Sequence, residues 1–210
     1  MQTDSNSKID WRKAADALVK KGQRTIKAPE PGAFLPPRPS WEQTCKYQSY
    51  RNTDLAKLPP QTQKALPGIL SWEYGPRGLL LNGPTGTGKT RCAWLLIKKL
   101  WEAGISIAAF DCADFGHRCI RYFRDGEAEE WLGRMAKHPL IFFDDFGKMP
   151  FTERVEAELF TLIERRMAHS LPCIYTMNMT SDDLMGKASE DRGRPLVRRL
   201  RESCRVVTLR

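Results

Sequence analysis

Residues 83–90 read Gly83-Pro84-Thr85-Gly86-Thr87-Gly88-Lys89-Thr90. This stretch matches the pattern G-x-x-x-x-G-K-[ST] at every fixed position, and the pattern is typical of a loop that wraps around polyphosphate. The apolar run at residues 78–82 predicts a buried strand before the loop, and the apolar positions from residue 92 predict a helix after it. A chance glycine-rich turn is therefore the weaker interpretation, because strand, loop and helix follow one another in the required order.

Each residue type in this loop suits the binding of phosphate. Glycine tolerates positive φ, so Gly83, Gly86 and Gly88 let the backbone turn tightly and direct its N–H groups inward. The following helix adds unpaired N–H groups and the positive end of its dipole. Lys89 offers a charge to the β- and γ-phosphates, and Thr90 offers a hydroxyl to Mg²⁺. We predict that ATP and Mg²⁺ bind through Gly83, Pro84, Thr85, Gly86, Thr87, Gly88, Lys89, Thr90 and Arg91.

A second apolar run, at residues 140–143, ends in two carboxylates about 55 residues after the loop. A continuous apolar run of this kind predicts a strand that is buried on both faces. One carboxylate at its end can hold Mg²⁺, and a second can orient and deprotonate the attacking water. We assign Asp144 to the metal and Asp145 to the water. Two aspartates also suit a solvated turn, but their spacing from the phosphate loop favours the site.

Apolar periodicity and turn residues predict the remaining elements. We expect helices at residues 59–74 (interrupted at Pro67-Gly68), 92–103, 114–123, 127–137 and 195–201, further helices that begin at Thr152 and Ser181, and strands at 105–110, 172–177 and 205–209. Residues 41–50 have a mixed pattern. Strand and helix alternate at least four times, which predicts an α/β fold with a doubly wound parallel sheet flanked by helices.

Several candidate residues follow predicted strands directly. Ligands bind at the carboxyl ends of the strands in such sheets. Residues 85–90, Asp144, Asp145 and Asn178 all lie at these ends. We expect Asn178 to place its amide near the γ-phosphate and the attacking water, although a simple turn residue is the alternative. This convergence supports a nucleoside triphosphatase site.

Charge is concentrated near the two ends of the chain. The sequence has 210 residues and a formal net charge of +9. Residues 8–27 hold seven Lys and Arg against two Asp, and residues 192–210 hold seven Arg against one Glu. Such basic ends suit nucleic acid, an acidic partner or a bound phosphate, or they are solvated faces. An amphipathic helix at residues 8–22 and five prolines between residues 29 and 39 predict an arm at 1–40 that binds a partner, before an ATP-binding domain at 41–210.

Two further features bear on the environment of the protein. No apolar run approaches the roughly 20 residues that span a bilayer, and the first residues lack the apolar core of a signal peptide. We therefore expect no membrane partner and a cytoplasmic location. The six cysteines form no C-x-x-C pair, which favours buried or free thiols over a zinc site, although Cys112, His117 and Cys119 lie close in sequence.

Five motifs together resemble those of AAA+ ATPases from the DnaC/DnaI helicase-loader and IstB transposition-helper group. They are the phosphate loop, L-I-F-F-D-D-F-G at 140–147, I-E-R-R at 163–166, Y-T-M-N at 175–178 and V-R-R-L-R at 197–201. The resemblance covers roughly residues 45–210. It implies a P-loop NTPase (AAA+) parallel sheet flanked by helices, and we expect no C-terminal lid domain after the arginine motif.

The resemblance also assigns individual roles. Asn178 matches sensor 1, and Arg199 matches the arginine finger that reaches the ATP of a neighbouring subunit, with Arg198 as its nearest competitor. Arg166 matches an arginine of unassigned role. The implied partners are a replicative DNA helicase, single-stranded DNA and further copies of this chain in a homo-oligomer formed with ATP. A basic surface helix that contacts phosphates is the alternative for these C-terminal arginines.

One departure from the family pattern concerns turnover. AAA+ proteins often carry Glu where this chain has Asp145, so we expect slow ATP hydrolysis. The resemblance implies an ATP-dependent helicase loader, with a transposition helper as the alternative. A nucleotide-dependent DNA-binding scaffold with little turnover is a third hypothesis. A small-molecule kinase would require a mobile lid, and the sequence offers no clear one.

Overall fold

A five-stranded parallel sheet forms the centre of the computed structural model, which describes residues 38–52 and 55–210. The strands are β1 (Gly78–Asn82), β2 (Ile107–Asp111), β3 (Leu140–Asp144), β4 (Cys173–Met177) and β5 (Cys204–Thr208), in the order β2-β3-β4-β1-β5. Every neighbouring pair runs parallel. The predicted fold class is therefore confirmed. The helix predicted at residues 8–22 lies outside the described residues.

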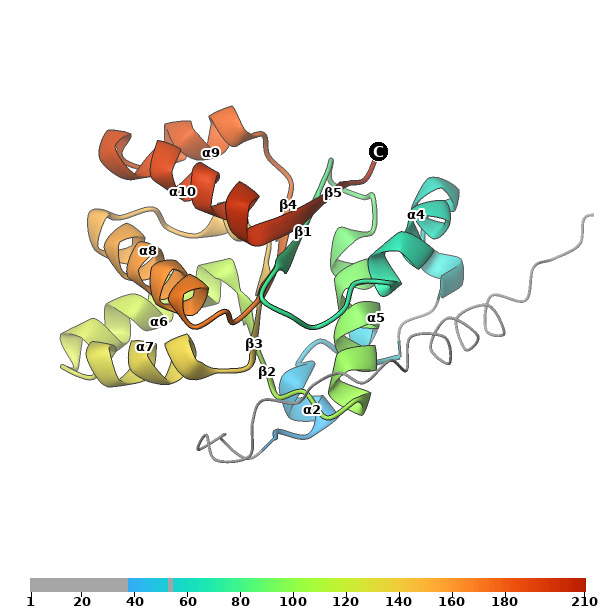
Figure 1. Cartoon of the computed structure of the whole chain (residues 1–210), viewed down its shortest axis with the longest axis horizontal. Helices are drawn as coiled ribbons and strands as arrows, with labels where there is room; N and C mark the ends of the chain where they lie inside the picture. Colours follow the sequence, from blue (N-terminus) through green and yellow to red (C-terminus); the bar gives the residue numbers. More distant parts are fainter. Residues whose placement is uncertain (1–37, 53–54) are drawn as a thin grey trace, which may run out of the picture.

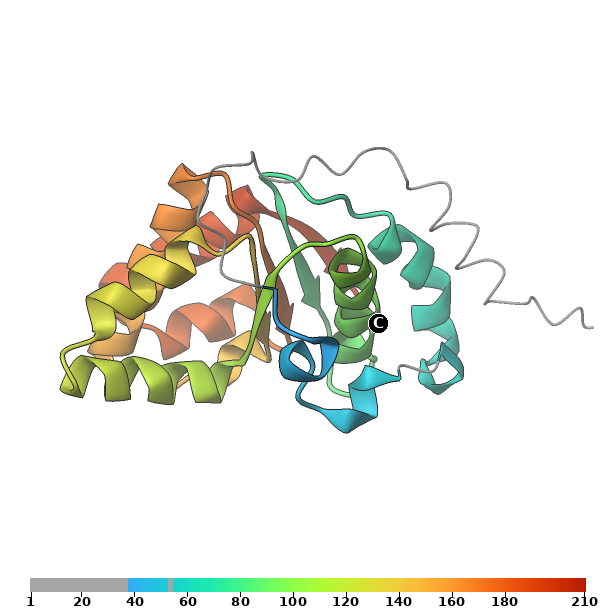
Figure 2. The same cartoon turned by 90° about the horizontal axis from the view of Figure 1, so that it is seen from below.

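Helices cover both faces of this sheet (Figures 1 and 2). One face carries α2 (Trp41–Thr44), α3 (Gln48–Arg51), α4 (Pro60–Leu70) and α5 (Lys89–Glu102). The other face carries α6 (Cys112–Arg124), α7 (Ala128–Lys137), α8 (Glu153–Ala168), α9 (Ser181–Lys187) and α10 (Glu190–Ser203). Two 3₁₀ turns, η1 (Leu55–Lys57) and η2 (Phe146–Lys148), lie in the connections. Parallel strands need crossover connections, usually helices, because the chain must return to the same end of the sheet before each new strand begins.

Side chains alternate between the two faces of the strands, and both faces of β1, β3 and β4 are buried. Leu80 of β1 packs under α8 and α10, whereas its neighbours Leu79 and Leu81 pack under α5. On β3, Phe143 stacks on Tyr175 with ring centroids 5.5 Å apart, and the adjacent Phe142 contacts Trp94 of α5 on the opposite face. The apolar runs that predicted these central strands therefore have no solvent-exposed face, whereas the edge strand β5 is partly exposed.

The sequence pattern placed some boundaries wrongly. The helix expected at residues 195–201 begins at Glu190, so Pro195 lies inside α10. Proline disfavours a helix interior, but the acidic first turn and the burial of Leu196, Val197 and Leu200 outweigh that cost. The helix expected at residues 59–74 ends at Leu70 and contains Pro67.

All six cysteines are free and buried, as the sequence predicted. The described residues hold no group of three or more His, Cys, Asp or Glu that would suit a metal ion. Among these same residues, no helix combines the length and apolarity needed to cross a membrane.

Arg166 is a buried cation with only 1% of its surface exposed. Its Nη1 donates to the carbonyl oxygens of Met135 and His138 at 2.8 and 2.7 Å, and its Nη2 donates to Pro172 O at 2.6 Å. Its Nε lies 3.1 Å from Cys173 Sγ. Two of these carbonyls belong to the C-terminal end of α7, where a helix dipole favours positive charge. Arg166 thus joins α8, the end of α7 and the start of β4.

We expect Arg166→Met to lower the free energy of unfolding by about 3 kcal/mol, because several buried carbonyls would lose their donor. The measurement is denaturant-induced unfolding. Arg165→Met is the matched control, since Arg165 is partly exposed and pairs with the exposed Glu129. That variant should change stability by about 0.5 kcal/mol at most. Equal losses from both variants would contradict the role given to Arg166.

Candidate nucleotide-binding site

The predicted phosphate loop connects β1 to α5, and its three glycines have positive φ. At Gly83, φ is 151°, and an added Cβ would lie 2.2 Å from Leu209 O. At Gly86 and Gly88, φ is 86° and 82°. Gly88 precedes the first residue of α5, so the loop leads directly into the N-terminus of that helix. A side chain at Gly83 would be excluded by backbone, and the other two positions would be strained.

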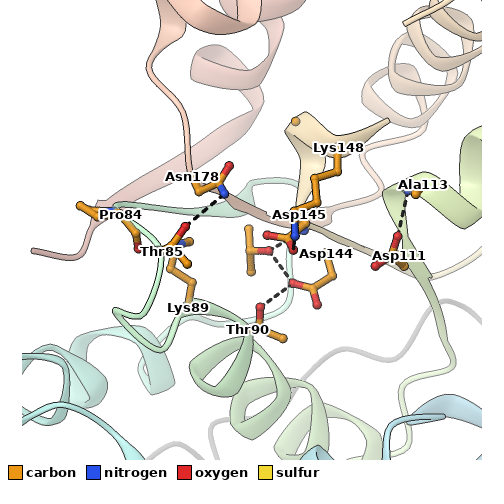
Figure 3. A network of polar contacts seen from close by, with 12 residues as sticks. Pro84, Thr85, Lys89, Thr90, Asp111, Ala113, Asp144, Asp145, Lys148 and Asn178 are labelled. Atoms are coloured by element: carbon orange, nitrogen blue, oxygen red, sulfur yellow. Dashed lines mark hydrogen bonds and ion pairs between the residues drawn. The ribbon is translucent and has the colours of Figure 1, made fainter. Parts of the chain in front are cut away.

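Lys89 and Thr90 direct their side chains to different parts of the site (Figure 3). Lys89 Nζ donates to Pro84 O within the loop at 2.7 Å. Thr90 Oγ1 donates to Asp144 Oδ1 at 2.8 Å. Burial lowers the pKa of Lys89, and the nearby carboxylates of Asp145 and Asp144 partly offset this effect. The loop and the end of β3 are therefore in direct contact, as the sequence predicted.

Asp144 is buried, and two hydroxyl groups stabilise its carboxylate. Thr176 Oγ1 donates to Asp144 Oδ1 at 2.5 Å, in addition to the bond from Thr90. Burial raises the pKa of Asp144, and the two hydroxyl hydrogen bonds oppose that shift. Thr176 was not among the predicted site residues. The signal in the sequence was a hydroxyl residue at the end of an otherwise apolar buried strand.

Asp145 follows β3 in the left-handed conformation, with φ 54° and ψ 52°. Its backbone N–H donates to Thr176 Oγ1 at 2.8 Å. Its carboxylate accepts a hydrogen bond from Lys148 Nζ at 2.6 Å. A non-glycine residue in this region costs about 1–2 kcal/mol. Asp145 lines the same cavity as the loop residues Thr85 and Lys89.

Asn178 reaches the loop from the end of β4, with its Nδ2 3.5 Å from Thr85 Oγ1. A cavity of about 350 Å³ lies between these elements. Its walls include the predicted residues Thr85, Gly86, Gly88, Lys89, Thr90, Arg91, Asp145 and Asn178, together with Tyr50, Lys57, Pro59 and Lys148, which the sequence did not point to. The strand ends therefore meet at one cavity.

The predicted arginine finger lies elsewhere. Arg199 packs over the ring of Phe160 at 4.2 Å and pairs with Glu164 on α8. The next residue of α10 toward the N-terminus, Arg198, has 67% of its side chain exposed and lies 3.7 Å from Glu202. The helix α10 runs directly into β5. The first residue of β5 pairs with the first residue of β1, which is the end of β1 away from the loop. Neither arginine lines the cavity of its own chain.

The residues that are present suit Mg²⁺ and a triphosphate. Mg²⁺ prefers oxygen ligands and usually takes one or two carboxylates together with phosphates and water. Thr90 Oγ1 and the carboxylate of Asp144 provide such oxygens 2.8 Å apart. Backbone with positive φ beside a helix N-terminus suits an anion. The donor set of the site thus fits both predicted ligands.

Sheet order, loop and strand-end residues together define a P-loop protein of the AAA+ class. A family model described as IstB-like ATP binding protein matches residues 41–208. The chain therefore belongs to the IstB-like family of ATP-binding proteins. No curated protein matches it in sequence.

Solved structures share the fold. The crystal structure of DnaI superposes with a TM-score of 0.64 and 17% identity, over 76% of this chain and 92% of that one. The DnaC helicase loader gives a TM-score of 0.67 and 21% identity, over 78% and 100%. The replication initiator DnaA, bound to AMPPCP and single-stranded DNA, superposes with a TM-score of 0.57 and 18% identity, over 84% of this chain and 51% of that one. The fold is thus the one found in the DnaC/IstB group of AAA+ proteins.

We expect Thr176→Val to destabilise the protein by about 2 kcal/mol, because Asp144 would lose a donor and the N–H of Asp145 would lose its acceptor. The two side chains are similar in size, so little volume changes. Denaturant-induced unfolding measures the difference. Thr161→Val is the control, because that hydroxyl bonds only to Ala157 O within its own helix. A loss no larger than in the control would contradict the role of Thr176.

Proposed function

We propose that this protein is an ATPase that loads a replicative DNA helicase onto single-stranded DNA. The observation that carries the proposal is that the phosphate loop, Asp145 and Asn178 line one cavity in an AAA+ fold, with Asp144 hydrogen-bonded to Thr90 of that loop. The similarity to the whole length of the DnaC helicase loader supports the choice of partner. Residues 1–40 would bind the helicase, and basic residues of the assembled subunits would contact the DNA.

The roles within the site follow from their chemistry. Thr90 and Asp144 would hold Mg²⁺, which neutralises phosphate charge when bound. The oxygen of a water attacks the γ-phosphorus, and the bond from that phosphorus to the β–γ bridging oxygen breaks. ADP leaves with the electron pair of that bond, and Asp145 accepts a proton from the water. Lys89 offsets charge on the phosphates, and the amide of Asn178 orients the water.

The length of Asp145 favours slow turnover. Its side chain is one methylene shorter than the Glu found in many AAA+ proteins, so its carboxylate reaches less far toward a water. Slow hydrolysis suits a protein that must remain assembled while a partner is transferred.

The test of the function is co-purification of the full chain with the replicative helicase in ATP and in ADP. We expect about tenfold more helicase to be retained in ATP, and Lys89→Ala to abolish the difference because triphosphate binding is lost. Asp145→Asn should keep the ATP complex and stop turnover. Failure of the protein to bind ATP or single-stranded DNA would contradict the proposal.

The match to the IstB-like family favours a second candidate, a transposition helper ATPase. The nucleotide site would be the same, so activity alone cannot separate the two. The same co-purification with a transposase in place of the helicase distinguishes them. A third candidate, a nucleotide-dependent scaffold, predicts that Asp145→Asn leaves the low turnover unchanged.

We further propose that Arg199 completes the site of a neighbouring subunit, with Arg198 as the competitor. Two observations bear on this choice. The guanidinium of Arg199 is engaged by Glu164 and Phe160, whereas that of Arg198 is largely exposed. A finger on α10 would act only between subunits, since neither side chain lines the cavity of its own chain.

Mixing of variants tests this role. We expect Arg199→Ala to bind ATP nearly as the parent protein does and to lose about tenfold or more of its turnover in the assembled state. Adding Asp145→Asn subunits should restore part of this turnover, because an intact site and an intact arginine then meet wherever the site of an Arg199→Ala subunit faces the arginine of an Asp145→Asn subunit. Arg198→Ala is the matched variant. Parental turnover by Arg199→Ala, with a loss in Arg198→Ala, would transfer the role to Arg198.

A further inference from the structure

Lys148 is one of four cationic residues that line the nucleotide cavity, with Lys57, Lys89 and Arg91, and neither the loop motif nor the strand-end motif includes it. Its Nζ lies 2.6 Å from Asp145 Oδ2, and it lines the same cavity as Lys89, Thr85 and Asn178. Its side chain is 58% exposed, whereas that of Asp145 is 24% exposed. An ion pair this open to water contributes little to stability. Its position, beside the proposed base and within a phosphate site, needs another explanation.

The backbone of Lys148 is held in place by packing, whereas its largely exposed side chain is held by the single contact with Asp145. Phe146, two residues earlier, is fully buried. An added Cβ at Gly147 would lie 1.8 Å from Met179 Cε, so the turn packs closely against the residue after Asn178. Lys187 Nζ donates to Gly147 O at 3.0 Å. A fixed backbone therefore carries a flexible side chain of four methylenes and a compact charge.

Two acceptors are available to this ammonium group in the proposed complex. One is the carboxylate of Asp145, and the other is the terminal phosphate of a triphosphate bound to the loop. A γ-phosphate would carry more negative charge than a single carboxylate, so it would attract the ammonium group more strongly at the same distance. The contact with Asp145 would then be exchanged for one with the phosphate, and the carboxylate would be released to the water.

We propose that Lys148 is a positioning residue that senses the γ-phosphate by exchanging partners between Asp145 and the nucleotide. This proposal rests on the proposed ATPase function, which supplies the triphosphate. It makes Lys148 a determinant of the preference for ATP over ADP. It also makes Asp145 available as a base only when the triphosphate is bound.

The test compares the affinities of full-length variants for ADP and for AMPPCP, which is not hydrolysed. We expect Lys148→Met to weaken AMPPCP binding about tenfold, the effect of losing one charge-assisted hydrogen bond, and to change ADP binding less than about twofold. Lys148→Arg should keep most of the preference. Lys137→Met, an exposed lysine at the end of α7, is the control for charge removal. Equal weakening of both nucleotides, or of neither, overturns the proposal.

A double-mutant cycle with Asp145→Asn distinguishes a direct contact between Lys148 and the γ-phosphate from simple neutralisation of Asp145 by Lys148. If Lys148 contacts the γ-phosphate, its replacement by Met weakens AMPPCP binding at least as much in an Asp145→Asn background, where the lysine is no longer held. If Lys148 only neutralises Asp145, the effect vanishes in that background, and the proposal is wrong. The test measures only nucleotide affinity, so its outcome does not depend on whether the protein hydrolyses ATP or binds the helicase. A parent protein that binds neither nucleotide would overturn both proposals.

Discussion

A carboxylate in the interior must find hydrogen-bond donors, and the arrangement of this site depends on how Asp144 finds them. Thr90 lies in the first turn of α5 and Thr176 lies near the end of strand β4, and both side chains donate to the same oxygen of Asp144. The bonds join the loop helix to two central strands. Removal of either donor would leave a charged group poorly solvated, which costs several times more than a surface hydrogen bond. The ends of β3 and β4 and the start of α5 are therefore joined by the carboxylate of Asp144, the same group that would bind the metal.

The sequence predicted the features that depend on local patterns. Apolar runs located the strands, and the spacing of glycine, lysine and threonine located the loop, because both patterns record the requirements of a single segment. Asp144 and Asp145 were recognised from their place after a buried run. The start of α10 was missed, since the local cost of Pro195 is outweighed by burial against the rest of the protein.

The residues that the sequence did not reveal act through distant partners. Thr176 bonds with Asp144, which is 32 positions away, and the turn that carries Lys148 packs against Met179. Arg166 matched a family motif without an assigned role, because its partners are backbone carbonyls that leave no side-chain pattern. In the described structure it supports the packing of α7, α8 and β4 and lies outside the nucleotide cavity. Sequence motifs thus located the site, and three-dimensional contacts explained its support.

The direct passage from α10 into β5 has a mechanical consequence. No residue separates Ser203, the last of the helix, from Cys204, the first of the strand. At the other end of β5, Leu209 N donates to Asn82 O at 2.7 Å, and Leu209 O lies where a side chain on Gly83 would be. The arginine helix and the first glycine of the loop therefore lie at opposite ends of one five-residue strand. A displacement of α10 along this strand would move the residue that packs against Gly83, since no linker separates helix and strand.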